Sequence, residues 1–422
     1  MFERTALPDG PRVISARLPG SRSLSVAAYV LAGARTESKE QAGVAHFMEH
    51  LTFKGTEAYP TGRLVSEAIE GVGGTSNAAT DRESTVYWTR LPVREAERAV
   101  EVLGELIVRP RLADAEIDRE REVIVEEIRS YRDDAAQYVY TVFDEAFFGD
   151  TPLGREIAGD EESVRALPAE AIRDFWRASY RPANTVIAVA GDIAHDSVVE
   201  LVARSFGRGN GPVPGWAPAP APLPAGERFR VVERAGTQAH ICLGVEALRR
   251  DHPDAWTLEL LTAVLGDGSS SRLFLSVRED AGLAYDVHAF TSDYADCGTL
   301  QIYAGVDPDD LGAALEAILR ELARLRDEPV PGTELIKTRN YVRGRLELRL
   351  EESRHLASWI GVQEALHERV LSLDEAIDAL EAVTAEQIQV LAGRLFRDQA
   401  LALAVVAPPG HGSRLDRSLL LS

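Results

Sequence analysis

The sequence is poor in the features that mark secreted and membrane-spanning chains. Its 422 residues include only two cysteines, Cys242 and Cys297, which are too few for a disulfide framework and lack the spacing of metal ligands. No run of about 18 or more apolar residues occurs, and the N-terminal stretch lacks the basic start and apolar core of a secretory signal. We therefore expect a cytoplasmic protein without a membrane segment.

Basic residues are also in deficit. The chain has 46 lysines and arginines against 67 aspartates and glutamates, which gives a formal net charge of −21. Such a charge repels a phosphate backbone, so nucleic acid is not expected as a partner. Acidic walls attract cationic peptides or metal ions instead, although the charge by itself is equally consistent with a surface that only keeps the protein soluble.

The length and one compositional shift indicate two domains. Single hydrophobic cores stop growing near roughly 250–300 residues, and this chain is longer, with 45% hydrophobic residues. The stretch "GRGNGPVPGWAPAPAPLPAGE" is dominated by Gly, Pro and Ala, a composition typical of an extended linker. We predict an N-terminal domain at 1–211, a linker at 212–226 and a C-terminal domain at 227–422.

The two halves show a similar order of elements. Each half opens with β-rich segments, continues with a helix and further strand sequence, and closes with two long helical stretches and a final strand. The long helical stretches are expected at 92–108 and 114–132, and at 309–326 and 333–368. This order predicts an α+β fold of two homologous domains, each a mostly antiparallel sheet with helices packed on one face.

A short motif, "VAHFMEHLTFKGT" at 44–56, carries the clearest chemical signal. On a helix, His46 and His50 stand four residues apart on one face, which Glu49 shares. Two imidazoles can bind one zinc ion, but a catalytic site needs a third protein ligand and an open position for water. The order H-x-x-E-H is the inverzincin signature, whereas by itself so short a pattern also fits a solvated helix face.

A third ligand is available in the predicted helix "DREREVIVEEIRSYRDD". Glu120 and Glu127 lie seven residues apart, two turns along one face, so one carboxylate could bind a metal and the other could orient a histidine. Glu126 is a rival, but about 100° of helical rotation separates it from its neighbour. An ordinary charged helix surface remains the alternative interpretation of this stretch.

Together with "GGTSNAATDRESTVYW" and "GDGSSSRLFLSVREDAGLAYDVHAF", these stretches resemble the M16 metallopeptidase family over nearly the whole chain. This family includes pitrilysin, insulin-degrading enzyme and the mitochondrial processing peptidase. Its pattern is H-x-x-E-H followed downstream by E-R-x-x-x-x-x-E, whose last glutamate is Glu127 here. The resemblance implies one Zn²⁺ per chain bound by His46, His50 and Glu127, with Glu49 as general base and Glu120 as an acid behind the ligands.

The resemblance also implies residues that hold a peptide. Asn77 and Ala78 would form an exposed sheet edge that pairs with substrate backbone, although the segment also reads as an ordinary interior strand. The second half has no histidine at the place of the zinc helix. It carries Arg278 and Tyr285, which match the family pair that reaches over from the second half of a clamshell, where Tyr285 would bind the oxyanion and Arg278 a substrate carbonyl.

The function implied by the resemblance is zinc-dependent endopeptidase activity on unfolded peptides or presequences inside an enclosed chamber. A chain of this length carries half of the units in long family members, so a homodimer is expected, with a heterodimer containing an inactive paralogue as the alternative. The competing hypothesis is a non-catalytic structural or peptide-binding subunit. The intact zinc motif and Glu49 favour the enzyme.

Overall fold

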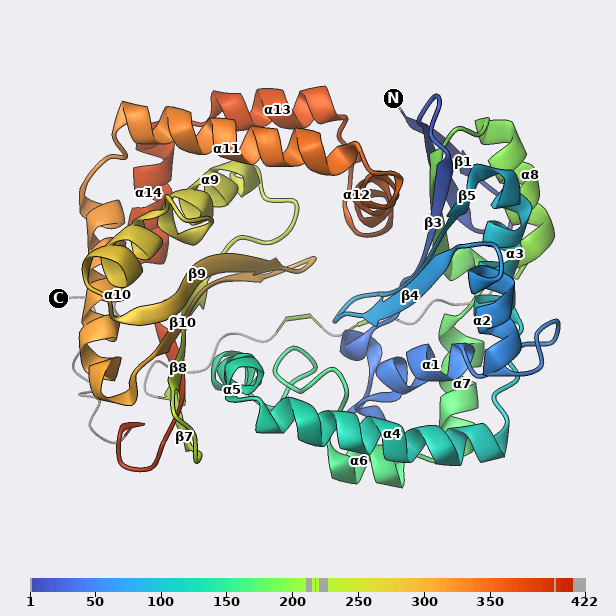
Figure 1. Cartoon of the computed structure of the whole chain (residues 1–422), viewed down its shortest axis with the longest axis horizontal. Helices are drawn as coiled ribbons and strands as arrows, with labels where there is room; N and C mark the ends of the chain where they lie inside the picture. The colour runs from blue at the N-terminus through green and yellow to red at the C-terminus, as the bar shows by residue number, and fades with distance from the viewer. Residues whose placement is uncertain (1, 210–214, 217, 220–226, 398–399, 413–422) are drawn as a thin grey trace. The chain divides into compact units, whose positions relative to one another are not determined.

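The computed structural model describes residues 2–209, 215–216, 218–219, 227–397 and 400–412. The chain forms two compact units, each with its own sheet (Figure 1). The first unit comprises Met1–Arg129, Glu156–Ala217 and Glu347–Ser372. The second comprises Ser130–Arg155, Pro218–Leu346 and Leu373–Ser422. Each half of the chain therefore contributes one segment to the unit formed mainly by the other half.

The first unit is built on a six-stranded sheet. Its strands, in the spatial order β1-β2-β6-β3-β5-β4, are β1 (Phe2–Ala6), β2 (Arg12–Arg17), β6 (Thr185–Gly191), β3 (Ser23–Val30), β5 (Thr85–Pro92) and β4 (Thr75–Thr80). All neighbouring strands run antiparallel except β2 and β6. The central strands β3 and β6 are almost entirely buried, which explains their near-continuous apolar sequence. β4 forms one edge of the sheet.

Most helices of the first unit share a core with one face of this sheet. They are α1 (Val44–Thr52), α2 (Gly62–Glu70), α3 (Ala96–Val108), the greater part of α4 (Asp114–Asp133), α6 (Glu161–Ala166), α7 (Ala169–Ser179) and α8 (His195–Phe206). Val26 and Val189 from the sheet belong to the same buried cluster as Leu103 of α3 and Val202 of α8. The opposite face is covered by α12 (Ser353–Leu366), from the second half of the sequence, whose Ile360 joins a separate cluster.

The second unit repeats this plan with five strands. In the order β7-β11-β8-β10-β9 they are β7 (Phe229–Glu233), β11 (Ala402–Ala407), β8 (Ala239–Glu246), β10 (Gly298–Val306) and β9 (Ala284–Asp293). Only β7 and β11 are parallel neighbours. Its remaining helical segments are α9 (Ala255–Gly266), the π-helical turn η6 (Phe274–Asp280), α10 (Leu311–Asp327), α11 (Gly332–Leu350, which ends in the first unit), α13 (Leu373–Ala382) and α14 (Ala385–Leu395).

The second sheet is also covered on both faces. Ile241 and Ile302 share a cluster with Leu261 of α9 and Ile318 of α10 on one face. On the other face, α5 (Ala135–Phe148), from the first half of the sequence, packs against β11 and β8 (Figure 1). Each unit therefore receives a helix from the opposite half of the chain, and these two helices occupy equivalent positions after α4 and α11.

The predicted α+β fold with two similar halves is confirmed, and each sheet carries the expected helical layer. The sequence did not predict the exchanged helices α5 and α12. The single helix expected at 333–368 is wrong, because the chain breaks between α11 and α12, where Glu352 has an extended backbone conformation. This break lets the chain return to the first sheet.

The division into consecutive domains at 1–211 and 227–422 stays a prediction. The two compact units of the structure differ from it in that each also contains a segment from the other half of the chain. Most of the linker predicted at 212–226 lies outside the described residues. Within the part of the chain that is described, none of the helices combines the length and apolar character needed to cross a bilayer. The cytoplasmic location stays a prediction.

Candidate metal centre

The centre begins with α1, a two-sided helix. Residues such as Phe47, Met48 and Leu51 on one side are fully buried in the first unit's core. His46, Glu49 and His50 occupy the remaining side and are only partly buried. The helical period thus fixes the direction of the three polar side chains, because the buried stripe anchors the opposite face.

The start of α1 is held by Glu37, a buried carboxylate. It accepts hydrogen bonds from the backbone N–H groups of Gly43, at 2.9 Å, and Ala45, at 2.7 Å. These are among the donors that a helix N-terminus leaves without internal partners, and an anion is favoured there. Gly43 has a φ of 92°, and a Cβ at this position would lie 2.5 Å from the carbonyl oxygen of Ala158. Glu37 and Gly43 therefore fix where the histidine-bearing helix begins.

Two side chains of α1 and one of α4 converge at the polar face of α1. His46, His50 and Glu127 of α4 each offer one ligand atom, and these atoms lie within 4.8 Å of one another. One carboxylate oxygen of Glu127 lies 3.3 Å from Nε2 of His50, and the other lies 3.8 Å from Nε2 of His46. Two imidazoles and one carboxylate form a donor set typical of catalytic zinc sites.

A carboxylate and a lysine stand behind His50. Nδ1 of His50 lies 2.9 Å from Oε1 of Glu120, whose side chain is only 3% exposed. The ammonium of Lys54 donates to Oε2 of the same carboxylate at 2.7 Å. In a neutral imidazole, donation from Nδ1–H leaves the lone pair on Nε2, the atom that faces Glu127. Glu120 and Lys54 thereby set the tautomer that a metal requires.

The electrostatics of the cluster follow from these contacts. Burial lowers the pKa of His50, but hydrogen bonds to Glu120 and Glu127 outweigh burial and raise it to about 9. Burial raises the pKa of Glu120, yet hydrogen bonds from His50 and Lys54 bring it below its ordinary value. The hydrogen bond from His50 likewise holds the pKa of Glu127 low. Both carboxylates are therefore ionised at neutral pH and favour a bound cation.

His46 provides a test of whether a metal fits. Its Nδ1 is buried and has no hydrogen-bond partner among the described residues. Its Nε2 lies 3.8 Å from Glu127, which is beyond hydrogen-bond distance. Burial and the neighbouring His50 also hold the pKa of His46 below its ordinary value, which favours the neutral ring that binds a metal. The donor set and the incomplete bonding of His46 both fit a zinc ion.

The rival carboxylate Glu126 points elsewhere. Its side chain is 69% exposed and forms an ion pair with Arg129 at 2.6 Å, three residues along α4. Glu127 and Glu120 lie on the face of α4 that meets α1. The helical phase argued from the sequence therefore selects the carboxylate that the structure places beside the histidines.

Glu49 has a different environment from the three clustered side chains. The hydroxyl of Thr80, at the end of β4, donates to Oε2 of Glu49 at 2.6 Å. This contact fixes one carboxylate oxygen and leaves the other available for a proton. Sequence reasoning missed Thr80, Lys54 and Glu37. Lys54 had a readable signal, because it stands four residues after His50, one helical turn on.

The edge strand β4 lies next to α1. Asn77 and Ala78 pair with Trp88 and Tyr87 of β5, and within the described residues no strand pairs with the other side of β4. The N–H of Ala78 donates to the side-chain oxygen of its neighbour Asn77 at 2.9 Å. The alternative of an interior strand is excluded for these residues. The Ala78 N–H bonds to a neighbouring side chain and not to a strand, so this edge can pair with another extended chain.

Arg278 and Tyr285 lie together in the second unit. Arg278 is in η6, and its guanidinium carbon lies 5.6 Å from the centre of the Tyr285 ring. Gly282 adopts a φ of 66° in the turn between η6 and β9. The side chain of Tyr285 is 78% exposed, so its hydroxyl is available to a ligand or to another surface.

Comparison with known proteins identifies the family. Residues 12–161 match the family model described as "Insulinase (Peptidase family M16)", and residues 166–342 match "Peptidase M16 inactive domain". An uncharacterized zinc protease of Mycobacterium leprae, ML0855, is 34% identical over 99% of this chain and 94% of that protein. The chain belongs to peptidase family M16. The M16 resemblance inferred from the motifs is thus confirmed.

Other M16 relatives align over similar lengths. The uncharacterized zinc protease YmxG of Bacillus subtilis is 33% identical, over 97% of this chain and 99% of that protein. The mitochondrial-processing peptidase subunit beta of Bos taurus is 30% identical, over 96% and 84%. A solved protease structure from Helicobacter pylori superposes with a TM-score of 0.89 at 22% identity, covering 97% and 99% of the two chains. The last comparison supports the fold.

Proposed function

We propose that this M16 protein is a zinc-dependent endopeptidase that hydrolyses unfolded peptides or presequences. The observation that carries the proposal is the convergence of His46, His50 and Glu127 beside a separate carboxylate, Glu49, on the same helix face. The names of its relatives, zinc proteases and a processing peptidase, support the same reaction. A purely structural metal site would have no need of Glu49 beside the three ligand side chains.

In this proposal His46, His50 and Glu127 hold the metal. Bound zinc supplies Lewis acidity toward a carbonyl oxygen and lowers the pKa of a coordinated water. Glu49 accepts the proton of the attacking water and passes it to the leaving amine, while Thr80 holds its other oxygen. Glu120 and Lys54 keep His50 oriented and its Nε2 directed at the ion.

The substrate would add as a strand to the edge of β4. Backbone pairing gives affinity with little sequence preference, which suits a peptidase of unfolded chains. The N–H of Ala78, now bonded to Asn77, would turn to a substrate carbonyl, and the released Asn77 amide would become a further contact. Because Thr80 ends the same strand and donates a hydrogen bond to Glu49, the pairing edge is joined directly to the base on α1.

We further propose that two clamshell halves enclose the reaction, with Arg278 and Tyr285 acting on the substrate. The exposed Tyr285 hydroxyl would donate to the developing oxyanion, and Arg278 would bind a substrate carbonyl. Because one chain carries both the zinc set and this pair, a homodimer is sufficient. An inactive paralogue as heterodimer partner is the alternative assembly, and the closed chamber would exclude folded domains.

The test is cleavage of a mixed set of quenched fluorescent peptides by the purified full chain, before and after zinc chelation. We expect cleavage that stops on chelation and returns on zinc addition. The matched variant is Glu49→Gln, which should retain the metal and lose about 10²–10⁴-fold in turnover, because general-base catalysis contributes that much. Full activity in this variant would remove Glu49 as the base.

A second candidate is a non-catalytic, peptide-binding or structural subunit. The match of residues 166–342 to a domain described as inactive favours keeping it. This candidate predicts zinc and peptide binding without cleavage, even after addition of a candidate partner chain. Chelator-sensitive cleavage by the purified chain alone would exclude it.

A further inference from the structure

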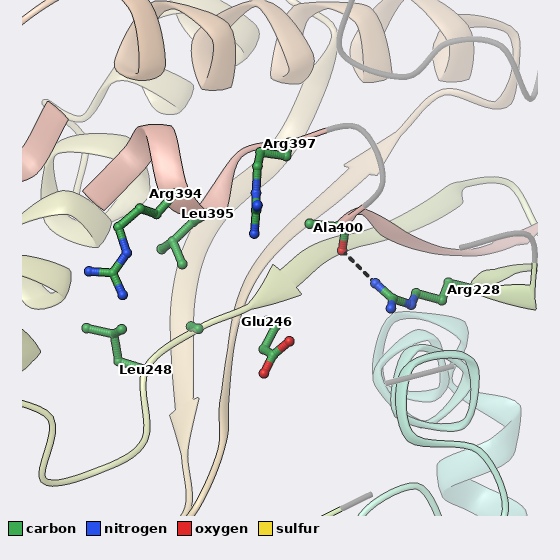
Figure 2. Close-up of a pocket in the computed structure, with 8 residues that line it drawn as sticks. Arg228, Glu246, Leu248, Arg394, Leu395, Arg397 and Ala400 are labelled. Atoms are coloured by element: carbon green, nitrogen blue, oxygen red, sulfur yellow. Dashed lines mark hydrogen bonds between the residues drawn. The ribbon is translucent and has the colours of Figure 1, made fainter. Parts of the chain in front are cut away.

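A polar pocket lies in the second unit, at the C-terminal end of β8. It has a volume of about 840 Å³ and is lined by Arg228, Glu246, Ala247, Leu248, Arg394, Leu395, Arg397 and Ala400. Figure 2 shows the side chains of Arg394 and Arg397 on one wall, Arg228 on another and Glu246 across from them. Its size is within the range of small-molecule sites, roughly 300–1,000 Å³.

The charge of this pocket runs against the charge of the protein. Three arginines and one glutamate line it, in a chain whose formal net charge is −21. The arginines come from three places in the sequence: the residue just before β7, the last turn of α14 and the segment just after α14. Arginine is the side chain best suited to planar recognition of carboxylate and phosphate groups. A local excess of guanidinium groups in an acidic protein therefore indicates a site for an anionic group.

The internal contacts of Arg394 and Arg397 leave binding capacity unused. Arg394 has one long ion pair, at 3.4 Å, with Asp254. Arg397 is exposed, and within the described residues its side chain has neither an ion pair nor a hydrogen bond. The Arg228 side chain donates to the carbonyl oxygen of Ala400 at 3.2 Å, and burial lowers its pKa, as expected for a partly desolvated cation.

The remaining lining defines the rest of a ligand. Leu395 lies between Arg394 and Arg397, and Leu248 lies beside Arg394, so these largely buried side chains supply the apolar part of the lining (Figure 2). Glu246 faces the arginines and can accept a hydrogen bond from a hydroxyl or amine. A free inorganic ion would leave this surface uncovered, whereas an organic anion would cover it.

We propose that this pocket binds a small organic anion, whose phosphate or carboxylate group contacts Arg394 and Arg397 and whose apolar part lies on Leu248 and Leu395. The pocket shares no lining residue with the candidate metal ligands, and its existence does not depend on peptidase activity. Phosphate esters and carboxylates share the chemistry that guanidinium groups recognise, so the experiment compares both sources.

Isothermal titration calorimetry of the full chain with inorganic phosphate, pyrophosphate and succinate tests the proposal. We expect at least one probe to bind, and to bind more weakly as salt rises, because the attraction is electrostatic. The double variant Arg394→Gln/Arg397→Gln should weaken this binding at least tenfold. The control is Arg320→Gln, which removes an exposed arginine of α10 outside the pocket and should leave the affinity unchanged.

The outcomes separate cleanly. Preference for phosphate or pyrophosphate assigns a phosphate-bearing ligand, and preference for succinate assigns a carboxylate-bearing one. Absence of binding by all three probes overturns the proposal. Equal binding by the wild type and the double variant also overturns it, because the anion would then bind elsewhere, for example at the candidate metal ligands. Urea unfolding of the double variant at the wild-type midpoint would show that the variant is folded.

Discussion

The two units of this protein share a sheet and differ at one helix face. Five strands of the first sheet correspond in order and direction to the five strands of the second, including the single parallel pair. The strands β3 and β8 correspond to each other, and the α-helix that follows is α1 in the first unit and α9 in the second. α1 presents His46, Glu49 and His50, whereas α9 has no histidine and is buried around most of its circumference.

This difference teaches that the topology does not carry the chemistry. The same scaffold presents a candidate set of metal ligands in one unit and an apolar core helix in the other, because only a few side chains on one exposed face need to change. The absence of ligands from α9 also frees the second unit for other roles. Its exposed Tyr285 and its arginine-lined pocket both lie in that unit.

The largest effect is expected from replacing a proposed zinc ligand, the feature of α1 and α4 that the described part of the second unit lacks. Glu127→Gln should lower zinc affinity by more than about 100-fold, because a lost ligand should cost more than a lost supporting carboxylate. Glu126→Gln is the matched control, since Glu126 pairs with Arg129 on the helix surface and should leave affinity unchanged. Metal content after dialysis and competition with a chromogenic chelator measure both. Equal losses in the two variants would break the assignment.

A smaller effect is expected for Glu120 and Lys54, which support the ligand His50 without being ligands themselves. Glu120→Gln should weaken zinc binding by roughly 10–100-fold, because the amide no longer fixes the tautomer and orientation of His50 as a carboxylate does. Lys54→Met should act in the same direction and less strongly. Chelator competition measures both, and wild-type affinity in Glu120→Gln would show that His50 does not depend on this carboxylate.

The exchanged helices offer a comparison of stability between the units. A Cβ on Gly361 of α12 would lie 2.5 Å from the Tyr29 ring, and a Cβ on Gly244 of β8 would lie 2.6 Å from the Phe143 ring of α5. Alanine at either position should therefore cost about 1–3 kcal/mol in the free energy of unfolding. Gly393→Ala on α14, where a Cβ meets nothing within 4 Å, should cost nothing or stabilise. Urea unfolding measures all three.

A cost at only one of the two glycines would show that the exchanged helices do not pack alike. No cost at either would contradict the close packing of α5 and α12 on the sheets. Zinc affinity should stay at the wild-type level in Gly244→Ala, because Gly244 belongs to the second unit.

The smallest expected effect concerns the base. Thr80→Val should lower kcat about tenfold, since a hydrogen bond to a charged group is worth about 1.5–3 kcal/mol and only part of it acts on the reaction. Zinc content should not change, and Thr80→Ser should restore activity because it keeps the hydroxyl. Loss of zinc together with activity would show that Thr80 acts on the fold of the site instead.

Much of the candidate site was predictable because it follows the helical period. His46, Glu49 and His50 share one face at spacings of three and four, and the phase of α4 separated Glu127 from Glu126 before any coordinates. The contacts of Thr80 with Glu49 and of Glu37 with the start of α1 were not predictable, since they join residues from different elements. Lys54 lies close to His50 in sequence, yet its bond to Glu120 joins the turn after α1 to α4.

The sequence by itself determined the local elements, the duplication and the residue types of the metal cluster, because these depend on periodicity and spacing along one chain. Only the tertiary structure decided which carboxylate meets which histidine atom, that β4 is an edge, and that α5 and α12 are exchanged. The sequence predicted helices on one face of each sheet, whereas the apolar strands β6 and β11 are buried on both faces. The strand sequences could not say which helix provides the second cover, because that choice depends on the path of the chain between the units.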